Sequence, residues 1–340
     1  MEAFAVEHVS TSLHATTARP ASVIRFIHTL LFVVLVLPSP AANAYQGVID
    51  AWCADLADRL HSVSADSCRS MNFNAAREFT ARNNALVSRD FGATDDSASA
   101  QGAKRVLLIG GIHGDELTSI SIVFRWMDWI RQPGAALYHW RVIPVANPDG
   151  LKARPSTRIN ANGVDINRNF QTPDWDKDAQ NYWVQRARRD PRRYPGKTAG
   201  SEVETRWLQA QIDEFRPDVI ISVHAPYNLL DYDGPVPQPM RFGRLSLNRL
   251  GVYPGSLGNY GGLFKQVPVI TIELPNATTM PARREQLVMW QDMLDWMKNN
   301  ISTLAVKPLP EESTGAAAML SVAGSDAVDT LSPSSQYLPD

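Results

Sequence analysis

The fold is decided by VLLIGGIHGDE, residues 106–116. The four apolar residues at its start are typical of a buried strand, and the two glycines that follow indicate a turn into a helix. His113 and Glu116 lie three residues apart in this turn, so both side chains can face one metal ion. The pair alone is a weak signal, because a His and a Glu at this spacing also arise by chance.

Outward from this stretch, apolar segments alternate with helical patterns. Apolar runs typical of buried strands lie at 104–111, 139–146, 218–224 and 267–274. Helical patterns lie at 117–130, 201–215 and 281–299. Ser201 and Glu204 have the spacing of a capping box at the start of the second helix. The alternation predicts an α/β fold with one sheet covered by helices on both faces.

Three other segments are less regular. Residues 45–100 are polar and mixed after a helix-like start, residues 147–150 (NPDG) predict a turn, and residues 151–200 lack clear periodicity. A structureless stretch as long as the last one is usually functional or disordered, and its Asn, Arg and Trp residues favour a binding surface.

The chain ends differ in composition from its middle. Arg25 precedes an apolar run at 26–37, and Ala42-Asn43-Ala44 offers a cleavage site. We therefore expect residues 1–44 to be a signal peptide cleaved after Ala44, and the protein to be periplasmic or secreted. An uncleaved anchor is the alternative, although the run is shorter than the ~20 residues of a membrane span. Residues 45–302 form one predicted folded domain, and the acidic residues 303–340 form a predicted disordered tail.

The two cysteines and the net charge bound the class of protein further. Cys53 and Cys68 lie close together, and in an exported protein such a pair predicts one disulfide. The alternative is a metal site, but only His61 lies nearby, and three such ligands do not complete a structural zinc site. The net charge of −2 argues against a nucleic-acid partner held by bulk electrostatics.

Two residues downstream strengthen the metal hypothesis. His224 ends an apolar run, and although a lone His there is more often a buried core histidine, His-Glu-His is a known ligand set of catalytic zinc. Glu273 lies in the apolar run VITIEL, where an unpaired carboxylate is costly to bury. It either reaches solvent at the strand end or acts as a general base for zinc-bound water. Both residues are expected at the carboxyl edge of the sheet, where ligands bind.

Arginines provide candidate partners for a carboxylate or an oxyanion. Arg158 and Arg168 lie in the same long polar region and are flanked by Asn residues. A single arginine in such a region is usually a solvent-exposed loop residue. Two arginines in the same polar loop favour a role in binding. A basic run at 186–193 either contacts substrate carboxylates or is a solvated surface loop.

These motifs together resemble the zinc carboxypeptidase superfamily. The resemblance covers residues 104–298 and rests on His113 with Glu116, NPDG at 147–150, GVDINRNF at 163–170, SEVET at 201–205, His224 and Glu273. Within the superfamily the chain looks most like the bacterial murein peptide amidases, because RINANGVD at 158–165 runs directly into Asn167-Arg168 and PGSLGNY at 254–260 closely precedes the Glu273 strand.

The resemblance implies a fold and a set of roles. The fold would be a single α/β domain with a mixed, mostly parallel central sheet. One Zn²⁺ per chain would be held by His113, Glu116 and His224. Glu273 would be the general base and Arg158 would polarise the scissile carbonyl, while Asn167 and Arg168 would grip a terminal carboxylate. Tyr260 is the candidate for the family's mobile substrate-binding Tyr, with Tyr253 and Tyr227 as alternatives.

The implied activity is hydrolysis of the amide between γ-D-glutamate and meso-diaminopimelate in murein peptides. Three alternatives remain open at this point: a carboxypeptidase acting on ordinary peptides, a zinc N-acyl amino acid deacylase, and a murein-binding protein without activity. A full ligand set with a base argues against the last. A murein peptide is the expected partner, with no nucleic acid and no membrane span after processing, and the oligomeric state is left open.

Overall fold

A computed structural model describes residues 40–92 and 102–302 of the chain. The strands are β1 (Asn74–Phe79), β2 (Ala85–Phe91), β3 (Arg105–Ile109), β4 (His139–Ile143), β5 (Val219–His224), β6 (Leu229–Asp233), β7 (Arg241–Phe242), β8 (Leu245–Ser246) and β9 (Val269–Glu273). The α-helices are α1 (Pro40–Arg59), α2 (Ala65–Ser70), α3 (Leu117–Trp129), α4 (Pro148–Lys152), α5 (Gln180–Gln185), α6 (Val203–Phe215) and α7 (Arg283–Asn300). Short 3₁₀ or π turns are η1 (Ile166–Arg168), η2 (Trp175–Ala179), η3 (Pro191–Arg193) and η4 (Gly258–Phe264).

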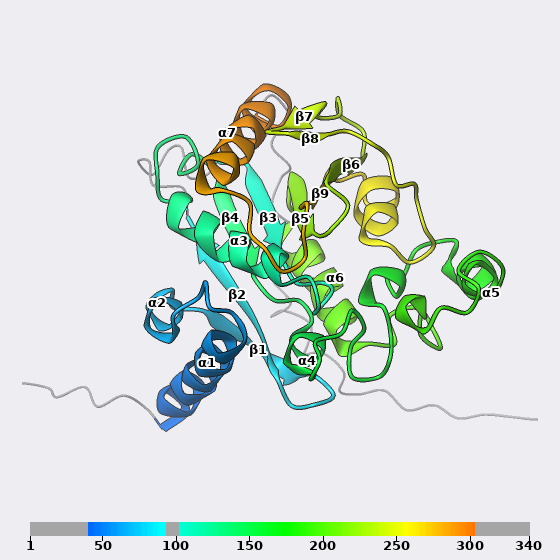
Figure 1. Cartoon of the computed structure of the whole chain (residues 1–340), viewed down its shortest axis with the longest axis horizontal. Helices are drawn as coiled ribbons and strands as arrows, with labels where there is room; N and C mark the ends of the chain where they lie inside the picture. Colours follow the sequence, from blue (N-terminus) through cyan, green and yellow to red (C-terminus); the bar gives the residue numbers. More distant parts are fainter. Residues whose placement is uncertain (1–39, 93–101, 303–340) are drawn as a thin grey trace, which may run out of the picture. The chain divides into compact units, whose positions relative to one another are not determined.

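One mixed sheet organises the domain. Its seven strands follow the order β1-β2-β4-β3-β5-β9-β6, and β7 and β8 form a separate small ribbon (Figure 1). The four central strands, β4, β3, β5 and β9, run parallel, while β2 and β6 flank them antiparallel. The predicted mixed and mostly parallel α/β sheet is therefore confirmed.

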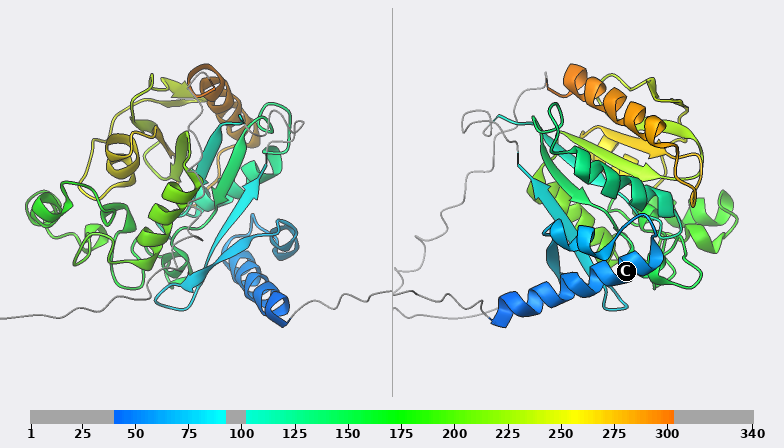
Figure 2. Two further views of the ribbon diagram at one scale, coloured as in Figure 1. Left: turned by 180° about the vertical axis from the view of Figure 1, so that it is seen from behind. Right: turned by 60° about the vertical axis from the view of Figure 1, so that its left-hand side comes forward.

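Both faces of the sheet are buried, which explains why its central strands are continuous apolar runs. In β3, Val106 and Leu108 belong to one hydrophobic cluster, whereas Leu107 and Ile109 belong to another on the opposite face. Residues of α1, α3 and α7 complete the first cluster, and residues of α6 and η4 complete the second. Figure 2 shows α6 on the face opposite α3 and α7.

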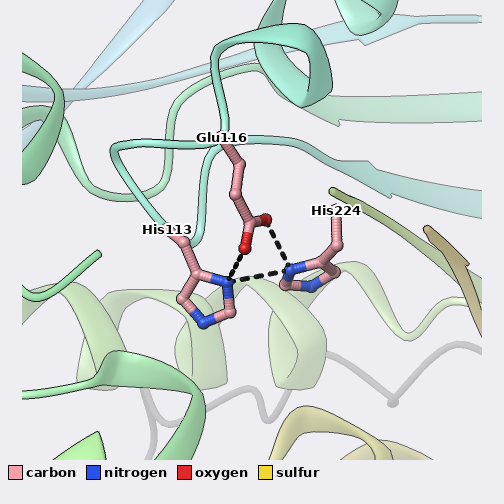
Figure 3. A group of neighbouring side chains, drawn as sticks. All are labelled: His113, Glu116 and His224. Atoms are coloured by element: carbon pink, nitrogen blue, oxygen red, sulfur yellow. Dashed lines mark hydrogen bonds and ion pairs between the residues drawn. The ribbon is translucent and has the colours of Figure 1, made fainter. Parts of the chain in front are cut away.

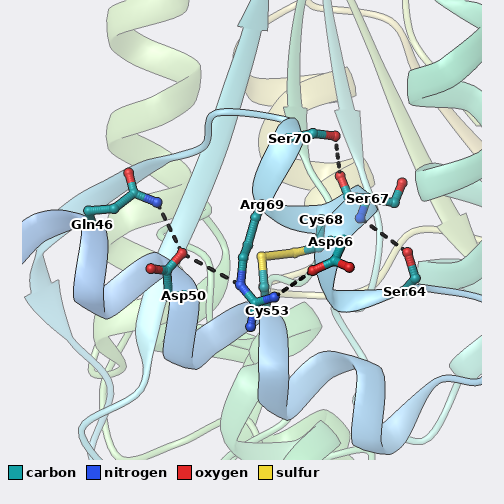
Figure 4. Close-up of a disulfide and its surroundings, with 9 residues drawn as sticks. All are labelled: Gln46, Asp50, Cys53, Ser64, Asp66, Ser67, Cys68, Arg69 and Ser70. Carbon is teal, nitrogen blue, oxygen red and sulfur yellow. Dashed lines mark hydrogen bonds and ion pairs between the residues drawn. A yellow bond between two sulfur atoms is a disulfide. The ribbon is translucent and has the colours of Figure 1, made fainter.

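A disulfide joins Cys53 of α1 to Cys68 of α2 across 15 residues (Figure 4). Both cysteines are fully buried. Beside them, Trp52 packs against Phe73 and against Phe124 of α3, with ring centroids 5.2 and 6.4 Å apart. The predicted disulfide is confirmed, and it fixes the two N-terminal helices over the first hydrophobic cluster.

The secondary structure predicted from the sequence is right for the buried strands and less accurate elsewhere. The capping box was wrong: Glu202 is the N-cap of α6, without a side-chain cap, and Ser201 Oγ donates to Glu202 Oε1 at 2.6 Å. The NPDG segment begins the short helix α4, with Gly150 N donating to Asn147 Oδ1 at 2.8 Å. Strands β1, β2 and β6 were not predicted.

The N-terminal and C-terminal predictions fall mostly outside the described residues. This holds for the signal peptide, apart from 40–44, and for the acidic tail from 303 onward. Among the described residues, no helix has both the length and the hydropathy that crossing a bilayer requires.

Candidate metal centre

Two neighbouring parallel strands deliver the metal-ligand candidates to the same edge of the sheet. His113 and Glu116 lie between β3 and α3, and His224 is the last residue of β5, the hydrogen-bonded neighbour of β3. Gly111 has a φ of 60°, and the left-handed conformation lets the chain turn sharply after β3. The strand-to-helix turn expected from residues 106–116 therefore places both of its polar side chains beside β5.

The three side chains converge on a common point (Figure 3). His113 Nδ1 lies 2.7 Å from Glu116 Oε1, and His224 Nδ1 lies 3.0 Å from Glu116 Oε2. The two Nδ1 atoms are 3.1 Å apart. All three residues are buried, with exposed fractions of 2–5 %.

The outer nitrogen of each imidazole also has a partner. His113 Nε2 lies 3.2 Å from Asp165 Oδ1, and His224 Nε2 lies 2.9 Å from Ser222 Oγ. An ionised carboxylate only accepts hydrogen bonds, so His113 donates from Nε2 to Asp165, and with a metal ion bound its Nδ1 would present a lone pair to that ion. The hydrogen bonds at the outer nitrogens therefore orient both rings with their Nδ1 atoms toward each other.

This arrangement fits a zinc ion. The two Nδ1 atoms are 3.1 Å apart, so lone pairs on both would repel each other unless a proton or a cation lay between them, and the carboxylate beside them adds a negative donor. His, Glu and His are the three protein ligands of one class of catalytic zinc site, which leaves a further position for water or substrate. The donor set, its burial and the oriented rings agree with the ligands predicted from sequence.

Arg158, which is partly buried, forms an ion pair with the fully buried Asp165 next to these ligands. Arg158 Nε donates to Asp165 Oδ2 at 3.0 Å, while its Nη1 lies 3.1 Å from His113 Nδ1 and 3.5 Å from Glu116 Oε1. Burial alone would raise the pKa of Asp165, but Arg158 and His113 hold that pKa well below its ordinary value. Asp165 therefore stays ionised and fixes both the arginine and the imidazole.

Glu273 ends β9 directly beside His224, its register partner on β5. It is 5 % exposed and lines a cleft whose wall also includes His113, Arg158 and His224. We call this space the cleft. Burial raises the pKa of Glu273, and the negative charge of Glu116 adds to this, while His224 opposes it. A carboxylate with a raised pKa beside a metal site suits proton transfer.

Asn167 and Arg168 reach the same cleft from η1. Asn167 Oδ1 accepts from Leu257 N at 2.8 Å, and Arg168 Nη1 donates to Asn167 O at 2.6 Å. The Arg168 guanidinium also stacks 4.3 Å from the centroid of the Tyr253 ring. Both side chains are thus held in place at the wall of the cleft.

Tyr260 is not brought to the cleft. It is 2 % exposed and packs in the second hydrophobic cluster, with its ring centroid 5.5 Å from that of Phe170. The expected place of Tyr260 in the substrate site is therefore wrong, because its ring is buried away from the cleft. Tyr253 and Tyr227, the two alternatives, both line the cleft.

Several residues in or beside the metal centre were not predicted from the sequence. Asp165 lies inside the GVDINRNF motif, and its burial and two partners could not be read from the motif. Ser222 shares the face of His224 by strand alternation, which was an available signal. From the basic run, Arg193 lines the cleft, and Arg192 Nη2 pairs with Asp115 Oδ2 at 2.8 Å.

The sequence is similar to that of known zinc-dependent hydrolases. A family model described as zinc carboxypeptidase matches residues 79–233. Murein peptide amidase A of Escherichia coli (strain K12) is 30% identical over 213 residues, which cover 58% of this chain and 83% of that protein. The protein of the same name from Vibrio campbellii is 32% identical over 185 residues, 52% of this chain and 72% of that one.

A solved structure shares the fold. Bovine thrombin-activatable fibrinolysis inhibitor, in complex with tick carboxypeptidase inhibitor, aligns with a TM-score of 0.51 at 15% identity, over 75% of this chain and 97% of that one. Fold and site together define a metallohydrolase. The chain belongs to the zinc carboxypeptidase family.

Proposed function

We propose that this protein is a zinc-dependent amidohydrolase that cleaves the γ-D-glutamyl–meso-diaminopimelate amide of murein peptides. The observation that carries the proposal is the gathering of a His-Glu-His ligand set, a buried Glu273 and three arginines along one cleft. The similarity to two murein peptide amidases supports the choice of substrate.

The metal site would contain one zinc ion per chain, held by His113, Glu116 and His224. When bound there, zinc would supply a Lewis acid that polarises a carbonyl oxygen and lowers the pKa of water. Asp165 and Ser222 would keep the two imidazoles oriented through their outer nitrogens.

The remaining residues would bind the substrate and move one proton. Arg158 would donate from Nη1 to the carbonyl oxygen, where negative charge develops during attack by water. Glu273 would accept a proton from that water and return it to the leaving nitrogen as the C–N bond breaks. Asn167 and Arg168 would hold the carboxylate of the leaving amino acid, because a guanidinium fork matches a carboxylate.

The disulfide supports a location outside the cytoplasm, since such bonds persist in oxidising compartments. A periplasmic or secreted protein would meet murein peptides directly, in agreement with the signal peptide expected from residues 1–44.

Mass spectrometry of digests tests the proposal. Zinc-loaded protein is incubated with L-Ala-γ-D-Glu-meso-diaminopimelate, with an ordinary peptide bearing a free C-terminus, and with an N-acetyl amino acid, each with and without a metal chelator. The expected products are L-Ala-D-Glu and free diaminopimelate, formed only without chelator. Preferential cleavage of the ordinary peptide or of the N-acetyl amino acid would overturn the choice of substrate.

A further inference from the structure

Arg158, the arginine assigned to the scissile carbonyl, lies at the end of a segment that is mostly without regular structure. We call residues 151–158 the Arg158 loop; its first two residues end α4, and the others belong to neither a helix nor a strand. Thr157 N donates to Gly150 O at 2.9 Å, and Arg158 O accepts from Asn147 Nδ2 at 3.0 Å. These two hydrogen bonds hold the end of the loop, whereas its beginning is held by another part of the chain.

An arginine of the N-terminal helix holds the beginning of the Arg158 loop. Arg59, the last residue of α1, has its Nε 3.2 Å from Leu151 O and its Nη2 2.7 Å from both Ala153 O and Ser156 Oγ. Ser156 Oγ in turn donates to Leu151 O at 2.8 Å. The donors of a guanidinium have fixed directions, so one side chain can tie three points of a loop together.

The guanidinium of Arg59 is committed to these contacts. Arg59 is partly buried, and within residues 40–92 and 102–302 no Asp or Glu forms an ion pair with it. Its partners are instead two backbone carbonyls and a hydroxyl of the Arg158 loop. Hydrogen bonds from a charged donor are stronger than those between neutral groups, so this contact restrains the loop effectively.

Two ion pairs accompany Arg59 along the same face of α1. Asp55 pairs with Lys152, and Asp58 Oδ2 lies 2.9 Å from Arg154 Nη2. The three residues of α1 share a face because residues three and four apart in a helix are neighbours. Both ion pairs are substantially exposed to solvent, so each stabilises the contact only weakly. Arg59 is therefore the main link between α1 and the Arg158 loop.

The helix that carries Arg59 is itself fixed in the domain. Its apolar side lies in the first hydrophobic cluster and includes Ile49, Trp52 and Leu56. The disulfide joins α1 to α2 (Figure 4), and Ser62 Oγ donates to Ser121 Oγ of α3 at 2.7 Å. Helix α3 begins directly after Glu116, so α1 is fixed to the same element that follows two of the metal-ligand candidates. Arg59 thus connects the Arg158 loop to a rigid support.

We propose that Arg59 is a positioning residue for Arg158: it holds the Arg158 loop so that the guanidinium of Arg158 stays where the carbonyl oxygen of the substrate becomes negatively charged. This inference rests on the proposed function, because it takes the role of Arg158 from there. Arg59 is not among the residues that line the cleft, so it acts through the loop alone. A donor held in place before the reaction stabilises developing charge best, and a shift of about 1 Å can lower the rate about 100-fold.

Hydrogen exchange measured by mass spectrometry tests the loop without any substrate. Zinc-loaded wild type, Arg59→Ala and the control Arg69→Ala are compared in peptides that cover residues 150–158. Arg69 lies in α2, and its partners Asp50 and Asp66 both belong to the two N-terminal helices. Exchange should be at least about tenfold faster in Arg59→Ala and unchanged in the control. Equal exchange in Arg59→Ala and wild type would overturn the inference.

A double-mutant cycle tests whether the loop acts through Arg158. Arg59→Ala should lower kcat about tenfold to a hundredfold and leave KM within about twofold, because Asn167 and Arg168 still hold the leaving carboxylate. In the Arg158→Ala background the same change should lower kcat less than about twofold, since the positioned group is absent. An equal loss in both backgrounds would show a general structural role and would refute the positioning of Arg158.

Two further variants keep the test available where Arg59→Ala does not fold. Arg59→Lys retains the charge without the planar fork, so it should lose less kcat than Arg59→Ala. Ser156→Ala removes one acceptor of Arg59 from the loop side and should change exchange and kcat in the same direction by a smaller factor. Wild-type exchange and kcat in both variants would contradict the inference.

The outcome for the proposed function is separate. The cycle uses whichever of the three substrates the wild type hydrolyses, because each has a scissile carbonyl for Arg158. Cleavage of the ordinary peptide instead of the murein amide overturns the proposed substrate and leaves the test of Arg59 intact. Unchanged exchange in the Arg158 loop overturns the role of Arg59, even where the murein amide is cleaved.

Discussion

Replacing Asp165 with Asn should weaken zinc binding while leaving the fold intact. Asp165 accepts from Arg158 Nε at 3.0 Å and from His113 Nε2 at 3.2 Å, so one buried carboxylate orients both a ligand and the arginine of the cleft. Asn has the same shape, but it lacks the charge and has only one strong acceptor. Asp165 accepts from three donors, because Asn167 N also donates to its Oδ1 at 3.0 Å, so at least one donor is left without its partner.

The expected loss follows from these two contacts. A hydrogen bond to a charged group contributes about 1.5–3 kcal/mol. Removal of an outer partner of a metal-binding His typically lowers metal affinity about 10–100-fold, which corresponds to roughly 1.4–2.8 kcal/mol. At saturating zinc, kcat/KM should still fall, because Arg158 loses its anchor.

Competition with a chromophoric chelator measures the zinc affinity of each variant. Asp149→Asn is the matched control, because Asp149 is equally buried and accepts from Arg82 N and Asn84 Nδ2 outside the cleft. The control should lose stability and keep its zinc affinity. Equal zinc affinity in Asp165→Asn and wild type would refute the role assigned to Asp165.

Three other predictions follow from single features. Burial raises the pKa of Glu204 to about 7, so the folded state binds more protons than the unfolded state between pH 4.5 and 7, and stability should fall by up to about 3 kcal/mol as pH rises through this window. Glu204→Gln should flatten that decrease in denaturant unfolding, and an unchanged pH profile would contradict the assignment. Replacing Cys53 and Cys68 with Ser should cost about 3 kcal/mol, and a reductant should lower only the wild-type unfolding midpoint; a midpoint insensitive to reductant would count against this. Arg168→Lys should raise KM at least about tenfold for substrates with a free leaving-side carboxylate, with no such increase for amidated ones; an equal increase for both would exclude the carboxylate contact.

The central sheet was predictable because both of its faces are covered. Strands β3, β5 and β9 are continuous apolar runs, and such runs are conspicuous in a sequence. Each delivers a polar residue at or just past its end, which is why His113, His224 and Glu273 could be proposed together. The edge strand β1 has mostly exposed residues and no such pattern.

The missed features depend on tertiary packing. The acids of LLDYD in β6 point into a cleft, and nothing in the segment itself distinguishes this from a solvent-facing strand edge. Tyr260 lies only 13 residues before Glu273, a shorter spacing than the resemblance implies, and η4 turns its ring into the hydrophobic cluster beside Phe170. Ser201 had the spacing of a cap, but its hydroxyl donates to the neighbouring Glu202.

Glu273→Gln tests the central claim most directly, with zinc content and turnover of L-Ala-γ-D-Glu-meso-diaminopimelate measured on the same sample. Elemental analysis should find one zinc ion per chain, as in wild type, because Glu273 is not among the three ligands. Turnover should fall about 10²–10⁴-fold, since the proton acceptor is lost. A variant that retains both its zinc and its full turnover would contradict the role of Glu273.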